Sequence, residues 1–115
     1  MTVKIFHNPR CSKSRATLQL LREQGIEPEI IEYLKTPPSA EELEYILYEL
    51  ELQPRDLMRR KEPEYKAADL DNPSLDRQAL IDAMVATPKL IERPIVLVNG
   101  KAAIGRPPEN VLKIL

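Results

Sequence analysis

Residues 2–33 read TVKIFHNPRCSKSRATLQLLREQGIEPEIIEY, and their pattern decides the fold of the chain. Residues 2–6 are short, rich in β-branched residues and followed by turn residues, so they predict a strand. From Ser12 the apolar residues recur at helical spacing until Gly25, which is a typical helix stop. Residues 29–33 predict a second strand. We therefore expect a βαβ unit with parallel strands and a right-handed crossover.

The middle of the chain predicts a helical insertion at about 39–91. Ser39 with Glu42 three residues later is typical of a capping box, and it opens a helix expected over roughly 40–51. The residues that follow contain further boundary signals. These are Pro54 and Pro63, which divide the stretch into short helical pieces, and Ser74, which predicts the N-cap of a helix ending near Ala86.

The last third of the chain returns to strands. Residues 95–98 (IVLV) and 101–104 (KAAI) flank Asn99-Gly100, the strongest short hairpin signal because a type I′ turn needs positive φ at both central positions. Two prolines then suit the start of a helix that runs to Leu115. The order βαβ, helical insertion, ββα predicts an α/β protein of the thioredoxin-like fold, with a mixed central sheet.

Composition excludes several classes of protein. The chain has 115 residues, of which 43% are hydrophobic and 30% charged, and this fits a single globular domain over residues 1–115. A net charge of −1 and the absence of Trp argue against nucleic-acid binding. No apolar run reaches membrane-spanning length, and one cysteine cannot form an internal disulfide or a cysteine-rich zinc site. We expect a cytoplasmic, monomeric protein without a membrane segment, a metal or a tightly bound cofactor.

The single cysteine, Cys11, lies where the first predicted helix begins. The backbone amides and the helix dipole at such a position stabilise a thiolate, and Arg10, Lys13 and Arg15 add positive charge. A lone cysteine is more often a small buried apolar residue, but these polar neighbours favour a nucleophile. The single histidine, His7, is either a structural hydrogen-bonding residue or a catalytic one.

Spacing excludes two kinds of cysteine chemistry. A phosphatase-type loop needs Arg six residues after the cysteine, where this chain has Thr17. Thiol–disulfide exchange of the usual kind needs Cys-x-x-Cys, and position 14 is Ser. Since no second cysteine exists, any oxidised intermediate of Cys11 has to be resolved by an outside thiol, either glutathione or a thiol-bearing partner protein.

Five segments together resemble the glutaredoxin-coupled arsenate reductase family, the ArsC-like branch of the thioredoxin-like superfamily, and most closely its short bacterial members. The resemblance runs in order along the whole chain. The segments are HNPRCSKSR at 7–15, TPP at 36–38, LMRRK at 57–61, ERPIV at 92–96 and GRPPE at 105–109.

The resemblance implies an activity and a set of residues. Cys11 matches the family's catalytic cysteine and His7 its motif histidine, while Arg59, Arg93 and Arg106 match the arginines that hold the oxyanion. The residues expected to support the active-site loop are Asn8, Ser14, Arg15 and Pro94, the last at the cis-proline position of thioredoxin-like folds. The implied reaction reduces arsenate to arsenite through a covalent Cys11 thiol–arsenate adduct, with glutathione as co-substrate and glutaredoxin as partner.

Three residues beside Cys11 depart from the family pattern. Arg10 and Ser12-Lys13 stand where small residues are usual, and these residues leave the physiological substrate open. Two other functions therefore remain possible on the same fold. One is a different glutathione-dependent thiol oxidoreductase, and the other is a non-enzymatic transcription regulator that binds RNA polymerase, although Ser14 removes the Cys-x-x-Cys switch that such regulators often use.

Overall fold

The computed structural model describes residues 2–115, so residue 1 of the predicted domain lies outside the described residues. The chain divides into two compact units. The sheet unit combines the residues up to Thr36 with Arg93–Leu115, and the helical unit is Pro37–Glu92. The predicted insertion at about 39–91 falls inside the helical unit. That the two units act as one domain over residues 1–115 stays a prediction.

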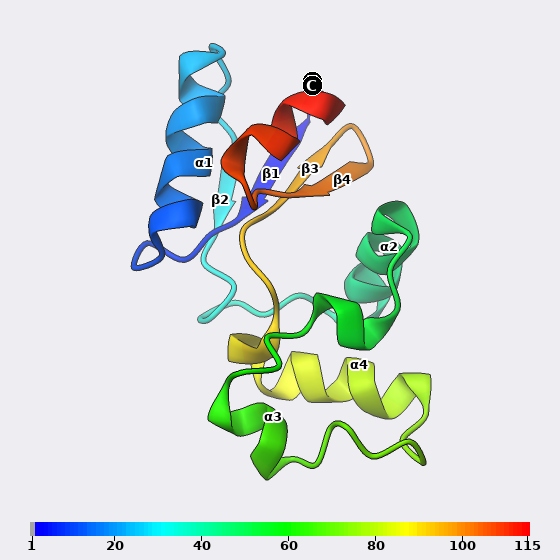
Figure 1. Ribbon diagram of the computed structural model, residues 1–115. Helices are drawn as coiled ribbons and strands as arrows, with labels where there is room; N and C mark the ends of the chain where they lie inside the picture. Colours follow the sequence, from blue (N-terminus) through cyan, green and yellow to red (C-terminus); the bar gives the residue numbers. More distant parts are fainter. Residues whose placement is uncertain (1) are drawn as a thin grey trace. The chain divides into compact units, whose positions relative to one another are not determined.

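The sheet unit holds four strands, one α-helix and one 3₁₀ helix within the described residues (Figure 1). Their bounds are β1 (Val3–Phe6), α1 (Ser12–Glu23), β2 (Glu29–Ile31), β3 (Ile95–Val98), β4 (Lys101–Ile104) and η3 (Pro108–Ile114). The strands form one sheet in the order β2-β1-β3-β4. β1 is parallel to β2 and antiparallel to β3, which is antiparallel to β4. This mixed sheet confirms the predicted thioredoxin-like fold.

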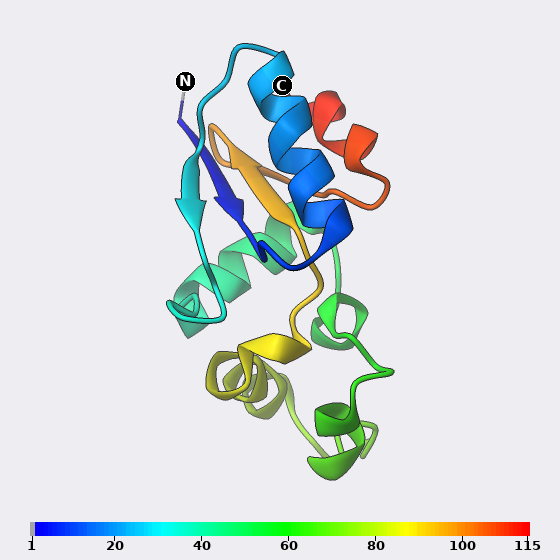
Figure 2. The ribbon, with the colours of Figure 1, turned by 90° about the vertical axis from the view of Figure 1, so that its left-hand side faces the viewer.

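The core of the sheet unit forms where α1 and η3 cover one face of the sheet (Figure 2). Side chains alternate across a strand, so one set of residues from β1 and β3 points to this face. The cluster consists of Val3, Ile5, Leu18, Leu21, Val96, Val98 and Val111. Each large aliphatic side chain buried here stabilises the fold by about 1.5–3 kcal/mol. This packing fixes α1 against the sheet through Leu18 and Leu21.

The structure confirms two local predictions, the end of α1 at Gly25 and the hairpin turn at Asn99-Gly100. Gly25 has φ of 78°, and the Ile26 N–H donates to the Leu21 carbonyl at 3.0 Å, as expected for a helix that ends in a left-handed glycine. Asn99 and Gly100 have φ of 48° and 90°. Both positive values confirm the predicted tight turn between β3 and β4.

Two elements of the sheet unit differ in detail from the prediction. The second strand ends at Ile31, before the predicted residue 33, because the chain turns at Glu32, whose carbonyl accepts the N–H groups of Lys35 and Thr36 at 2.9 Å. The C-terminal helix is of the 3₁₀ type. It has seven residues, and so short a segment gains little from the i→i+4 hydrogen bonds of an α-helix.

The helical unit contains five short helices within the described residues: α2 (Ala40–Leu50), η1 (Pro54–Leu57), α3 (Pro63–Ala67), α4 (Arg77–Ala86) and η2 (Pro88–Leu90). The Ser39 hydroxyl accepts the Glu42 N–H at 3.1 Å, which confirms the predicted cap of α2. Pro54 and Pro63 each begin a short helix, as expected. Within residues 2–115, no helix has the length and apolar character that crossing a membrane requires.

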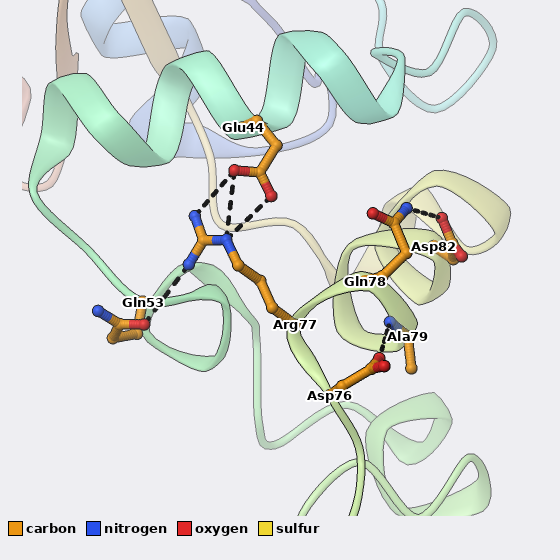
Figure 3. A network of polar contacts seen from close by, with 7 residues as sticks. All are labelled: Glu44, Gln53, Asp76, Arg77, Gln78, Ala79 and Asp82. Carbon is orange, nitrogen blue, oxygen red and sulfur yellow. Dashed lines mark hydrogen bonds and ion pairs between the residues drawn. The ribbon is translucent and has the colours of Figure 1, made fainter.

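The predicted N-cap at Ser74 is wrong, because the cap of α4 is Asp76. The Asp76 carboxylate accepts the Ala79 N–H at 2.8 Å (Figure 3). Ser74 is instead held in the preceding turn, where its N–H and its hydroxyl both donate to the Asn72 side-chain oxygen, at 2.9 and 2.7 Å. Asp and Ser are about equally good caps, so the competing turn decides between them.

A network of polar contacts joins three elements of the helical unit (Figure 3). Arg77, at the start of α4, donates through Nε to Glu44 of α2 at 2.9 Å, and through Nη1 to Gln53 before η1 at 3.5 Å. The Arg77 and Glu44 side chains are both 44% exposed, so the pair contributes at most about 1 kcal/mol.

Candidate active site

Cys11 is the N-cap residue of α1, with extended backbone angles of φ −95° and ψ 123°. Its N–H donates to the Asn8 carbonyl and its own carbonyl accepts the Arg15 N–H, both at 3.0 Å. The residue is 9% exposed. This position directs the sulfur toward the first-turn amides of the helix, which have no carbonyl partner within it.

Opposing influences act on the pKa of the Cys11 thiol. Burial is the largest of them and raises the pKa. The backbone amides of Ser14 and Lys13, together with the charge and a hydrogen bond of the Arg93 guanidinium, lower it and outweigh the burial. The net pKa lies below that of an ordinary cysteine, so the thiolate is more populated near neutral pH.

Replacing Arg93 by glutamine is expected to raise the pKa of Cys11, because it removes a positive charge and a hydrogen bond while the burial remains. The rate of alkylation by iodoacetamide at pH 7 should fall by roughly three- to ten-fold, and the midpoint of its pH profile should move upward. Arg22→Gln, an exposed substitution at the far end of α1, is the matched control. Superimposable profiles for Arg93→Gln and the wild type would contradict the proposed influence.

Ser14 joins the end of β1 to the first turn of α1. It is fully buried, and His7 is 6% exposed. The Ser14 Oγ accepts the Asn8 N–H at 3.0 Å and is hydrogen-bonded to His7 Nδ1 at 2.6 Å. Since the amide donates to this oxygen, the hydroxyl proton can be donated to Nδ1 of a neutral imidazole. Burial, the largest influence, lowers the pKa of His7, with Arg22 and Arg15 acting in the same direction and Glu32 opposing them.

Ser14→Ala should destabilise the protein by about 1–3 kcal/mol, because it leaves His7 Nδ1 and the Asn8 N–H buried without their partner. Chemical denaturation of the full chain measures the change in the free energy of unfolding. Ser12→Ala, at an exposed position two residues away, should change it by no more than about 0.5 kcal/mol. Equal effects of the two substitutions would mean that the hydroxyl does not hold the loop.

The remaining predicted loop residues also lie around the cysteine loop. The Arg15 guanidinium donates through Nη1 to the Pro9 carbonyl at 2.9 Å, and the Asn8 side-chain oxygen accepts the Arg10 N–H at 3.0 Å. These contacts connect residues 8–10 to one another and to α1, so that Cys11 follows a compact turn. Arg15 therefore acts on the loop through a backbone contact as well as through its charge.

Arg93, Pro94 and Arg106 lie together at the two ends of the β3–β4 hairpin. The Arg93–Pro94 peptide is cis, as expected at this position, and the Arg106–Pro107 peptide is also cis. The Arg106 guanidinium donates through Nη1 to the Arg93 carbonyl at 3.2 Å. Two of the three predicted oxyanion-binding arginines are thus neighbours within the sheet unit.

Arg59, the third predicted arginine, belongs to the helical unit. Its guanidinium forms an ion pair with Glu62 at 2.5 Å, and the two side chains are 21% and 16% exposed. Lys89 also pairs with Glu62, at 3.5 Å. Arg60, the next residue in the LMRRK segment, pairs with Asp56 and is more exposed. Arg59 is therefore a largely buried cation that is paired with a neighbouring carboxylate.

Gly105 and Thr17 form a close contact that the sequence analysis missed. A Cβ atom added to Gly105 would lie 2.4 Å from Thr17 Oγ1 and 2.8 Å from Pro94 Cγ. The Gly105 N–H donates to the Pro94 carbonyl at 2.9 Å, and Thr17 is fully buried. The absence of a side chain at Gly105 thus lets the backbone that follows β4 lie directly against Thr17 of α1 and against Pro94. The residues meet across 88 positions of sequence, and no local pattern predicts such a contact.

Within residues 2–115, no group of three or more His, Cys, Asp or Glu side chains is placed to hold a metal ion. The polar groups that act on the Cys11 thiol are the backbone amides of Ser14 and Lys13 and the Arg93 guanidinium. Such donors suit an anion and a thiolate.

Comparison with known proteins gives a consistent result. A sequence model of the ArsC family matches residues 6–114. The chain is 59% identical to the uncharacterized protein YfgD of Escherichia coli K12, over 98% of this chain and 96% of YfgD. It is 56% identical to a Neisseria meningitidis protein named arsenate reductase, over 98% of this chain and 97% of that protein. The structure of an arsenate reductase from Vibrio cholerae matches with a TM-score of 0.97 at 55% identity, over 100% of this chain and 98% of that chain. The chain belongs to the ArsC family.

Proposed function

We propose that the protein is an arsenate reductase that uses Cys11 as its nucleophile and external thiols as its reductant. The observation that carries the proposal is the placement of Cys11 at the start of α1, where amides and Arg93 lower the pKa of its thiol. The names of the relatives at 56% identity and above 95% coverage support arsenate as the substrate.

Arsenate is a tetrahedral oxyanion, and the proposed binding groups are suited to it. Arg93 and Arg106 supply guanidiniums whose planar donors match two oxygens of such an anion, and the first-turn amides of α1 supply further donors. Arg59 is proposed as the third cation. To bind arsenate, it has to share its guanidinium between the anion and Glu62.

The chemical step we propose begins with attack of the Cys11 thiolate on arsenic. A sulfur–arsenic bond forms, and one oxygen leaves as water after it takes up a proton. Arsenic is then reduced from the +5 to the +3 state by two electrons. These come from two external thiols, which leave joined as a disulfide. Water then replaces the Cys11 sulfur on arsenic, so the sulfur–arsenic bond breaks, arsenite leaves and the thiol is regenerated. The overall reaction is H₃AsO₄ + 2 RSH → H₃AsO₃ + RSSR + H₂O.

The external thiols are proposed to be glutathione and a glutaredoxin. Cys11 is the single cysteine of the chain, so the chain cannot form an internal disulfide after the adduct forms. A compartment that keeps this thiol reduced, such as the cytoplasm, fits this requirement. The working unit is proposed to be one chain.

The direct test is turnover of the purified protein with arsenate, glutathione, glutaredoxin, glutathione reductase and NADPH. We expect NADPH oxidation that requires arsenate and all of the thiol components, with arsenite formed in equal amount. Omission of glutaredoxin is the control for the partner. Absence of arsenite formation under these conditions would contradict the proposed function.

The same preparation discriminates the two other functions. Activity toward a glutathione mixed disulfide without activity toward arsenate would indicate a different thiol oxidoreductase, for which the reactive Cys11 is equally suited. Retention of RNA polymerase by the immobilised protein, unchanged by alkylation of Cys11, would indicate a regulator. The lowered pKa of the thiol favours an enzyme, since a regulator without a second cysteine has no use for it.

A further inference from the structure

A hollow of about 310 Å³ lies beside the cysteine loop and has no role in the oxyanion chemistry above. It is formed by residues 7–10 together with Glu32, Leu34 and Lys35, and we call it the loop–turn hollow. Its volume is at the lower end of the range for small-molecule sites, about 300–1,000 Å³. The hollow is therefore large enough for a small ligand.

The two walls of the hollow are brought together by the sheet. β1 and β2 are parallel neighbours with Phe6 opposite Ile31, and the His7 N–H donates to the Ile31 carbonyl at 2.8 Å. The loop that follows β1 and the turn that follows β2 therefore leave the same edge of the sheet side by side (Figure 2). Clefts outside the carboxyl ends of parallel strands are common ligand sites in α/β proteins.

The charges of the loop–turn hollow form a definite pattern. Arg10 and Lys35 are cations, and Glu32 is an anion that lies 3.6 Å from the Lys35 ammonium. The Arg10 guanidinium makes no hydrogen bond or ion pair with any residue of 2–115. Leu34, which is 43% exposed, adds an apolar wall. A ligand with two negative groups, one positive group and an apolar stem would complement this set.

We infer that the loop–turn hollow binds glutathione, the external thiol of the reaction. Glutathione carries two carboxylates and one ammonium, which pair with Arg10, Lys35 and Glu32 respectively. Its thiol lies on the central residue, between the charged ends. The inference rests on the proposed function, because it names where the reductant of that reaction binds.

The hollow is placed to deliver a thiol to the reaction. Arg10 directly precedes Cys11, and adjacent Cα atoms are about 3.8 Å apart. The Asn8 carbonyl that accepts the Cys11 N–H belongs to the same wall. A ligand anchored in the hollow by both of its charged ends is therefore held beside the loop that carries Cys11. Arg10 stands where the family usually has a small residue. In this inference it selects the reductant, because it binds one of the carboxylates of glutathione.

Binding without chemistry is tested by titrating the full chain with S-methylglutathione, which has no free thiol, while recording ¹⁵N–¹H NMR spectra. We expect shifts centred on residues 7–10 and 32–35. Arg10→Glu with Lys35→Glu should raise the Kd at least about ten-fold, whereas Arg10→Lys should preserve binding. Lys101→Glu, an exposed charge reversal on β4, is the matched control and should leave the Kd unchanged. An unchanged Kd in the double variant, or shifts centred elsewhere, would overturn the inference.

Kinetics give a second, independent readout. In the arsenate assay, Lys35→Glu, a charge reversal in the hollow outside the cysteine loop, should raise the KM for glutathione about ten-fold while the KM for arsenate stays within about two-fold. With 2-mercaptoethanol, which has no carboxylate or ammonium, the variant should match the wild type. An equal loss with both thiols would overturn the inference, because it would show that Lys35 does not act through the charged groups of the reductant.

The binding test also separates this inference from the proposed function. If arsenate is not reduced but S-methylglutathione binds in the loop–turn hollow with the expected dependence on Arg10 and Lys35, the inference holds and the substrate assignment falls. If arsenate is reduced but the double charge reversal leaves the Kd for S-methylglutathione unchanged, the function holds and the inference falls.

Discussion

Replacing Cys11 by serine should lower the rate of arsenate reduction by about three orders of magnitude or more. The hydroxyl has nearly the same shape as the thiol but a far higher pKa, so it is not ionised at neutral pH and is a poor nucleophile. The amides of Ser14 and Lys13 and the Arg93 guanidinium stabilise an anion that this side chain does not form. Steady-state turnover with saturating glutathione and glutaredoxin measures the loss.

Two controls separate loss of the nucleophile from loss of the site. The free energy of unfolding of Cys11→Ser should stay within about 1 kcal/mol of the wild type, because the substitution is nearly isosteric. Binding of arsenate should persist, since the proposed guanidiniums are untouched. Turnover within ten-fold of the wild type would show that Cys11 is not the nucleophile, and loss of folding together with turnover would be resolved by Cys11→Ala.

The local part of this fold was predictable because its signals lie close together in sequence. Gly25 at the end of α1 and Asn99-Gly100 between β3 and β4 adopt positive φ that few other residues tolerate, so each fixes a boundary wherever it occurs. The same is true of Ser39, whose hydroxyl reaches the N–H of a residue three positions away. Such signals need no knowledge of the rest of the molecule.

The cap of α4 shows where local signals compete. Ser74 and Asp76 are both good N-caps, and the pattern alone cannot rank them. The choice follows from Asn72, whose side-chain oxygen accepts both donors of Ser74 and so commits it to a turn. The prediction failed because three polar residues within five positions can satisfy each other in more than one way.

The candidate site was predictable only in part, for a related reason. The sequence placed Cys11 at a helix start from neighbouring residues, and the geometry agrees. It did not predict that Ser14 would bond to His7, because a helix face and a strand end have to be packed before the two meet. The pairing of Arg59 with Glu62 was likewise missed, because it is made across a turn between η1 and α3, where a spacing of three residues predicts no contact.

Replacing Gly105 by alanine should both destabilise the protein and impair the active site. The added Cβ would lie 2.4 Å from Thr17 Oγ1 and 2.8 Å from Pro94 Cγ, far inside normal contact distance. Forcing one methyl group into such a packed site costs about 1–3 kcal/mol. Relief of the collision has to move Gly105 relative to Thr17 of α1 or to Pro94, and a shift of either one changes how Arg93 faces Cys11. We expect kcat/KM for arsenate to fall by about ten-fold or more and the pKa of the Cys11 thiol to rise.

Thr17→Ala distinguishes this local collision from general damage. It removes Oγ1 and Cγ2, the two Thr17 atoms within 3.0 Å of the added Cβ, and leaves only Pro94 Cγ in close contact. Alone, Thr17→Ala removes the hydrogen bond from Oγ1 to the Lys13 carbonyl at 2.8 Å, which should lower the free energy of unfolding by about 1 kcal/mol. In the double variant the two changes should compensate, so that it is more stable than Gly105→Ala and its Cys11 alkylates faster at pH 7. Residues that collide directly have to show coupling in a double-mutant cycle. If the losses of stability from Gly105→Ala and Thr17→Ala were simply additive, the contact between the two residues would therefore not hold the cysteine loop beside Arg93.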